Sequence, residues 1–322
     1  MRREKKRMMN NEHSDCKKEK TGSRKYELIL ANLHKEGFYW QDDPPCGFSM
    51  SDGKKLLCRQ TLLGYLKTKW LGKDICYFPQ MHSTNELASR LAVHGTSHGT
   101  VVMADHQTKG RGREGRDWLS QPGSGILLSF VYKEKIRLQD LFMLTMASSV
   151  GLVQALEKNN GLTAKIKWPN DLMIKGKKVC GILAEARLCG QNVDHVVVGI
   201  GMNVNTKMDE WPEEIKKTAT SLNEVQGKWL NREELAASIM HECEIVLDRM
   251  QKKGKEEILQ RWRNKSDTIG KKVYVFQDGK RFLEGLALDV NQEGALLIEK
   301  ESNGSVIEIY MGDISIRANE EG

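Results

Sequence analysis

Residues 165–204 decide the fold, and they read KIKWPNDLMIKGKKVCGILAEARLCGQNVDHVVVGIGMNV. Three runs, at 172–174, 179–186 and 195–204, are rich in apolar and β-branched residues. Between them stand the segments 175–177 and 187–194, which contain Gly176 and Gly190. Short apolar runs bounded by turn residues are typical of antiparallel strands. The stretch therefore predicts a strand meander.

The flanking sequence adds helices and further strands. Upstream, the pattern predicts strands at 75–78, 100–104 and 125–130 and helices at 85–92 and 141–156, with Ser83 or Thr84 as the N-cap of the first. Downstream, it predicts one helix at 232–263. After Gly270, short strands alternate with turns at 277–279, 291–294 and 302–304, which predicts a small barrel. This order of elements predicts an α+β centre followed by an all-β end.

The N-terminal region is basic and poor in apolar residues. Residues 1–25 hold ten Lys/Arg and four Asp/Glu, so +6 of the net charge of +7 lies there. Such a segment predicts a solvated, disordered arm. A short helix at 26–34, a loop at 41–54 and a second helix at 56–66 are predicted to follow it. Because the charge belongs to the arm, it is weak evidence for a nucleic-acid-binding fold.

Composition also bears on the compartment. The seven cysteines have no paired spacing, which predicts free thiols in a reducing environment. No apolar run approaches the roughly 18 residues of a membrane span, and no apolar segment follows the basic start. We therefore expect a cytoplasmic location and no contact with a membrane.

The first stretch with chemical potential is KGRGREGR, residues 109–116. Its three glycines let backbone N–H groups approach a ligand, and its four cations concentrate positive charge. Such a loop can form a nest for an anion, with arginine gripping phosphate through two parallel hydrogen bonds. A solvated basic turn or an RNA-binding segment would have the same composition. Its glycines also suggest a loop that orders when ligand binds.

Two further stretches carry polar groups beside buried strands. KWPND, residues 167–171, places a lysine, an amide and a carboxylate together, so it can meet phosphate and hold Mg²⁺ through oxygen. It can equally be a polar turn that opens a hairpin. Lys178 begins a predicted strand and can aim its charge into a cavity, whereas Gly181 leaves room for a ligand over the strand. An exposed turn lysine is the plainer interpretation of Lys178.

Taken in order, these motifs resemble those of the biotin–protein ligases. The resemblance rests on 110–116, 167–171, the GIL of 181–183 and the GIGMNVN of 199–205, and it covers about residues 74–320. It implies a class II synthetase-like biotin/lipoate ligase fold at 74–265, with a mixed or antiparallel central sheet. It also implies an SH3-like C-terminal barrel at 268–322.

The resemblance further implies the ligands and the site. ATP and biotin would be joined as an acyl-adenylate with Mg²⁺, and biotin would pass to a lysine of the biotin carboxyl carrier domain of a carboxylase. The implied catalytic residues are Lys178 and Arg113. The implied biotin-binding residues are Ser83, Thr84, Asn85, Gln107, Arg111, Gly112, Arg113, Lys178 and Gly181. The implied ATP and magnesium side comprises Arg116, Trp118, Lys167, Asn170, Asp171 and Asn203, with Asp171 as the Mg²⁺ ligand.

The N-terminus departs from the family pattern. Bifunctional members carry a winged helix that binds operator DNA, but residues 26–70 match only part of one. Within Ser23–Asp52, the similar residues can be a piece of its recognition helix and the start of its wing, or equally its first helix. We therefore expect a degenerate remnant without specific DNA binding. A biotin-responsive repressor and a lipoate or octanoate transferase remain the alternatives, and the sequence leaves a homodimer open.

Overall fold

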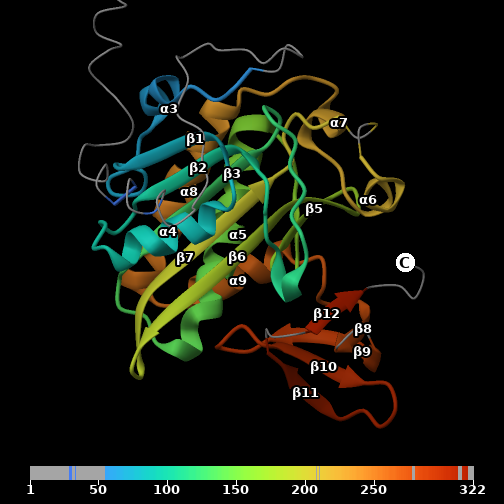
Figure 1. Ribbon diagram of the computed structural model, residues 1–322. Coiled ribbons are helices and arrows are strands. Elements are labelled where there is room, and N and C mark those ends of the chain that lie inside the picture. Colours follow the sequence, from blue (N-terminus) through green and yellow to red (C-terminus); the bar gives the residue numbers. More distant parts are fainter. Residues whose placement is uncertain are drawn as a thin grey trace, which may run out of the picture.

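A computed structural model describes residues 29, 30, 33, 55–207, 209, 211–277, 280–310 and 314–317 of the protein. In this part the chain forms a seven-stranded mixed sheet with helices on both faces, followed by a five-stranded antiparallel sheet (Figure 1). The predicted α+β class is therefore confirmed. The predicted arm at 1–25 and most of the helix at 26–34 lie outside the described residues.

The strands of the larger sheet run in the order β1-β2-β3-β7-β6-β5-β4. These are β1 (Ile75–Met81), β2 (Val101–Gln107), β3 (Ile126–Tyr132), β7 (Asn192–Met202), β6 (Lys177–Cys189), β5 (Asp171–Ile174) and β4 (Lys165–Lys167). Only β1 and β2 pair in parallel. The antiparallel run β4-β5-β6-β7 confirms the predicted meander.

Helices cover the sheet unequally. One face carries α4 (Thr84–Val93), which buries Leu87, Ala88 and Leu91 together with Leu33 of the N-terminal region. The other carries α5 (Leu141–Asn160) and α8 (Arg232–Lys253), which pack against each other in the larger core (Figure 1). Burial on both faces fixes the strand register, because a slip of one residue would reverse every side chain.

Two predicted helices differ in their bounds. The predicted helix 232–263 is divided into α8 and α9 (Glu256–Lys265), because Gly254 takes a φ of 83° and ends the first. The helix predicted at 56–66 is shorter, since α3 spans Arg59–Tyr65. Leu57 donates its N–H to the distant Asp105 carboxylate instead of joining the helix. A local glycine therefore divides the first helix, whereas a tertiary contact outweighs local propensity at the start of α3.

Short helices connect the larger elements. They are η2 (Arg113–Gly115), η3 (Leu138–Asp140), α6 (Glu213–Thr218) and α7 (Leu222–Gln226). In the described part, no helix has the length and apolar content needed to cross a membrane.

The cysteines are mostly as predicted. Cys76, Cys180, Cys189 and Cys243 are free thiols, and burial raises the pKa of Cys76 to about 12. Cys58 is disulfide-bonded, so the prediction of free thiols is wrong there. Spacing along the chain gives no sign of this pairing.

The smaller sheet stands where the sequence predicts a barrel. Its order is β11-β10-β9-β8-β12, all antiparallel. The strands are β8 (Lys272–Gln277), β9 (Lys280–Val290), β10 (Leu296–Lys300), β11 (Val306–Ile309) and β12 (Ile314–Arg317). In Figure 1 they gather below the larger sheet. The predicted turn at 277–279 is only partly among the described residues.

Trp168 joins the two sheets. This buried residue donates its backbone N–H to Thr268 Oγ1 (2.9 Å) and its indole N–H to the Gly294 carbonyl (3.1 Å). Its ring meets Phe142 of α5 edge-on at 5.9 Å. Because Trp168 lies inside the 167–171 motif, its contacts with Thr268 and Gly294 hold that motif in place.

We expect Trp168→Phe to lower the free energy of unfolding by about 1–3 kcal/mol, because the buried Gly294 carbonyl loses its indole donor. Urea denaturation measures the change. Trp229→Phe is the control, since Trp229 is 56% exposed. An equal effect of the two substitutions would contradict the proposed joint.

Candidate functional site

A cavity of about 180 Å³ opens at one end of the larger sheet. It collects the residues that follow β1 and β2, those that begin β5 and β6, and those near the end of β7. Every site residue predicted from the sequence lines it except Asn203. These are Ser83, Thr84, Asn85, Gln107, Arg111, Gly112, Arg113, Arg116, Trp118, Lys167, Asn170, Asp171, Lys178 and Gly181.

One wall of the cavity is polar and uncharged. Ser83 is the N-cap of α4 but makes no capping hydrogen bond with its side chain, and Ser83, Thr84 and Asn85 line the cavity. Gln107, at the end of β2, accepts from the Thr84 N–H (2.7 Å) and hydroxyl (3.0 Å). Ser129 Oγ lies 2.7 Å from Thr84 Oγ1 and 2.6 Å from Asn85 Oδ1. Hydroxyl and amide groups both donate and accept, which suits a neutral polar ring.

The floor of the cavity is β7, and two residues of that strand lack side chains. A Cβ on Gly199 would lie 2.0 Å from Asn85 Oδ1, and a Cβ on Gly201 would lie 2.5 Å from the Trp118 indole. Only glycine permits both approaches. The backbone of β7 therefore sets how close α4 and Trp118 can come.

The glycine-rich loop forms a small hairpin over the cavity. Arg111 pairs with Asp117 as a β-bridge, and the Gly112 N–H donates to the Arg116 carbonyl at 2.7 Å. Of its glycines only Gly115 has a positive φ, and the non-glycine Glu114 shares that conformation (φ 57°). Glu114 also forms an ion pair with Arg116. Ordering of this loop by ligand stays a prediction.

The opposite wall combines KWPND with the start of β6. Asn170 donates its amide to the Ile182 carbonyl (2.7 Å) and accepts from Arg113 at 3.5 Å. Lys178 Nζ lies 2.7 Å from Asp171 Oδ1 and 5.5 Å from the centre of the Trp118 ring. Lys178 is thus a cavity lysine, and the exposed-turn interpretation is wrong.

Two sequence predictions fit less well. A Cβ on Gly181 would lie 3.1 Å from the Trp118 ring and 3.2 Å from Lys178 Nζ, so protein atoms use the room predicted for ligand. Asn203 is buried outside the lining, and its amide donates to the Thr220 carbonyl at 3.1 Å. Asn203 therefore holds the loop after β7 through its side-chain amide. This geometry does not support the predicted contact with ATP.

The sequence interpretation also missed residues. Glu185 of β6 accepts from the Asn85 amide (2.6 Å) and pairs with Arg111 (3.5 Å), so it links the polar wall to the basic loop. Ser129 connects Thr84 with Asn85. A lone hydroxyl inside the apolar run of β3 was the one available signal for Ser129.

The lining of the cavity carries a net positive charge. Its lining holds Arg111, Arg113, Arg116, Lys167 and Lys178 against Glu114, Asp117 and Asp171, a formal charge of +2. Cations that converge on a cavity with low-dielectric walls attract anions. Among the described residues, no group of three His, Cys, Asp or Glu side chains could hold a metal ion. The cavity thus has the features of a site where an anionic cosubstrate meets a small polar ligand.

Comparison with known proteins agrees with this class of site. The model of the Biotin/lipoate A/B protein ligase family matches residues 77–203. The bifunctional ligase/repressor BirA of Bacillus subtilis (strain 168) is 33% identical over 287 residues, covering 89% of this chain and 87% of that protein. The biotin--[acetyl-CoA-carboxylase] ligase of Mycobacterium tuberculosis is 30% identical over 240 residues, covering 73% and 86%.

A solved structure matches as well. The biotin protein ligase from Aquifex aeolicus in complex with biotin and ATP superposes with a TM-score of 0.66 at 34% identity. It covers 77% of this chain and 100% of that one. The chain belongs to the biotin/lipoate protein ligase family.

We expect Gly199→Ala to cost about 1–3 kcal/mol of unfolding free energy, because the added methyl group overpacks the Asn85 amide. Chemical denaturation measures the loss. Gly64→Ala is the matched control, since a Cβ there would meet nothing within 4 Å. A Gly199→Ala protein as stable as the control would mean that α4 does not rest on β7 as described.

Proposed function

We propose that the protein is an ATP-dependent biotin–protein ligase that makes biotinoyl-AMP and transfers biotin to a lysine of a carrier domain. One observation carries the proposal: the neutral polar wall at 83–85 and 107 faces a cation-rich wall across the same cavity. The first suits the ureido ring of biotin, which donates and accepts. The second suits the biotin carboxylate and the ATP phosphates.

The reaction needs no covalent enzyme intermediate. A carboxylate oxygen of biotin attacks the α-phosphorus of ATP, and the bond to pyrophosphate breaks. An amine of the carrier lysine then attacks the acyl carbon, loses a proton, and AMP leaves. Lys178 would hold the carboxylate and later the acyl oxygen, while Arg113 would stabilise charge on the phosphate and close the site. Fixed cations serve this well, because they need no reorganisation as charge develops.

The ion pair between Lys178 and Asp171 orients both side chains before ligand binds. Asp171 keeps the lysine ammonium directed into the cavity until a substrate carboxylate replaces it. Asn170 and Asp171 offer the oxygen ligands that Mg²⁺ prefers, and the ion would neutralise phosphate charge when bound. Arg116, Trp118 and Lys167 would line the nucleotide side.

The proposed partner follows from the family resemblance. The acceptor is a lysine of a biotin carboxyl carrier domain, as the family resemblance implies. A lipoate or octanoate transferase is disfavoured by the Arg111–Arg113 loop. The absence of specific DNA binding, a homodimer and the cytoplasmic location stay predictions.

The activity test is ATP–pyrophosphate exchange with biotin or lipoate offered separately. Biotin should support exchange, because its carboxylate attacks the α-phosphorus, and lipoate should give only background. Omission of Mg²⁺ should abolish the signal. Exchange with lipoate alone, or no exchange with either acid, would overturn the proposal.

The roles of Arg113 and Lys178 can be separated. Lys178→Ala should slow adenylate formation more than tenfold, since loss of a hydrogen bond to a charged group costs about 1.5–3 kcal/mol. Arg113→Gly should instead leak the adenylate, which then labels lysines of a bystander protein. Rapid-quench kinetics and blotting for biotin measure the two effects. The same phenotype in both variants would show that we have divided the roles wrongly.

A further inference from the structure

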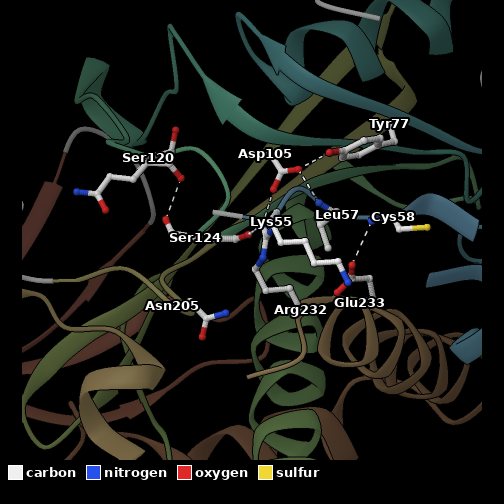
Figure 2. Close-up of polar contacts among 12 residues, drawn as sticks. Lys55, Leu57, Cys58, Tyr77, Asp105, Ser120, Ser124, Asn205, Arg232 and Glu233 are labelled. Atoms are coloured by element: carbon white, nitrogen blue, oxygen red, sulfur yellow. Dashed lines mark hydrogen bonds and ion pairs between the residues drawn. The ribbon is translucent and has the colours of Figure 1, made fainter. Parts of the chain in front are cut away.

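A buried ion pair lies outside the lining of the cavity. Asp105 of β2 and Arg232 at the start of α8 form it, with side chains 0% and 5% exposed (Figure 2). Removing two charges from water is costly, and such a pair persists only where further hydrogen bonds satisfy both ions. The partners of each ion therefore show which segments the pair holds.

Asp105 gathers three segments. Its carboxylate accepts from the Leu57 N–H at 2.8 Å, from the Tyr77 hydroxyl of β1 and from the Arg232 guanidinium (Figure 2). Three donors around one carboxylate satisfy it without water. Neutralising Asp105 would weaken all of these contacts together.

Arg232 reaches two backbone carbonyls as well. Its guanidinium donates to Gly125 O (3.0 Å) and to Lys55 O (2.5 Å). The neighbouring Glu233 accepts from the Cys58 N–H at 3.1 Å. The segment 55–58 is thus held at Lys55 and Cys58 by the start of α8 and at Leu57 by Asp105.

Asp105 and Gly125 are also the two stems of the active-site loop. The chain between them carries Gln107, the glycine-rich hairpin and Trp118, all of which line the cavity. Inside this span the Gln107 N–H donates to Ser120 Oγ at 3.1 Å, which ties its two halves together. One guanidinium therefore contacts both ends of the segment that walls and covers the cavity.

We propose that Asp105 and Arg232 are a positioning pair for this loop. They fix the spacing of its stems, and so the placement of Gln107 and Trp118, and they connect that placement to residues 55–58. The pair touches no substrate. The inference rests on the proposed function for its kinetic readout, and its structural readout is independent of ligand.

Arginine is needed here for its shape. Its planar fork presents donors in fixed directions, whereas a lysine ammonium is a point charge on a flexible stem. Arg232→Lys keeps the charge opposite Asp105 but cannot hold Asp105, Gly125 and Lys55 in the same geometry. Asp105→Asn keeps the side-chain volume and removes the charge, so it serves as the second variant if Arg232→Lys folds poorly.

Glu244 provides a matched control on the same helix. This buried carboxylate accepts from the N–H groups of Lys69, Trp70 and Leu71 at 2.7, 2.7 and 2.8 Å. It therefore binds the chain after α3 to α8 much as Asp105 binds 55–58, but it lies outside the cavity lining. Glu244→Gln should lower stability without moving the loop.

The experiment measures the KM for biotin, the KM for ATP and kcat in pyrophosphate exchange, beside thermal unfolding, for the full-length variants. We expect Arg232→Lys and Asp105→Asn to raise the biotin KM about tenfold, equal to about 1.4 kcal/mol of binding free energy. The ATP KM should rise as well, because the same loop carries Arg116 and Trp118 of the nucleotide side. Glu244→Gln should lower Tm comparably and leave the biotin KM within twofold of the wild-type value.

Hydrogen exchange of the unliganded proteins supplies the second readout. Faster exchange at 105–109 and 118–125 in Arg232→Lys and Asp105→Asn, but not in Glu244→Gln, supports the positioning role. If both variants keep the wild-type biotin KM and the wild-type rates of hydrogen exchange, the positioning role is overturned. Activity of the wild-type protein would still uphold the proposed function in that case. If the wild type neither binds biotin nor catalyses pyrophosphate exchange, the proposed function fails. Hydrogen exchange at 105–109 and 118–125 still decides whether the pair positions the loop.

Discussion

The close approach of α4 and Trp118 to the bare backbone of β7 is the constraint on which the site depends. At Gly199 and Gly201 a Cβ would lie 2.0 Å from Asn85 Oδ1 and 2.5 Å from the Trp118 indole. Because the floor has no side chains there, the amide of Asn85 and the indole of Trp118 can enclose one cavity. A larger residue at either position would separate the polar wall from the cation-rich wall.

Each wall is then anchored to a different appended region. The cation-rich wall contains Trp168, whose two N–H groups reach Thr268 and Gly294 of the smaller sheet region. Gln107 of the polar wall and the loop that follows it are positioned by the Asp105–Arg232 pair, which also binds residues 55–58. Distant parts of the chain thereby hold the 167–171 motif and the loop after β2 in place. Such support is needed because a mobile segment would not keep its hydrogen bonds to a ligand aligned.

Local sequence predicted the fold well where one periodicity dominates. The meander at 165–204 and the buried helix at 141–156 followed from alternation and length, because buried sheets and helices impose those patterns. The single helix predicted at 232–263 failed at Gly254, where a glycine punctuates an otherwise helical pattern. The shortened start of α3 depended on the contact between Leu57 and Asp105, 48 residues away, which no local pattern encodes.

The sequence motifs predicted most residues of the candidate site, but they did not predict which side chains contact one another. The motifs named the residues that would meet ligand, and nearly all of them line one cavity. Glu185, Ser129 and Arg232 carry no motif, because their roles come from partners up to 177 residues away, as for Arg232 and Lys55. The predicted ATP contact of Asn203 followed from its place in a motif, whereas its amide bonds to the backbone of a neighbouring loop.

The most direct measurement of the central claim is the identity of the small molecule that this cavity makes and keeps. The protein is incubated with Mg-ATP and equal amounts of biotin and lipoate, desalted and denatured, and the released ligand is identified by mass spectrometry. If the polar wall selects the ureido ring and the cationic wall activates its carboxylate, the retained species is biotinoyl-AMP. Retention of a lipoyl adenylate, or recovery of unreacted biotin and ATP alone, would contradict the account.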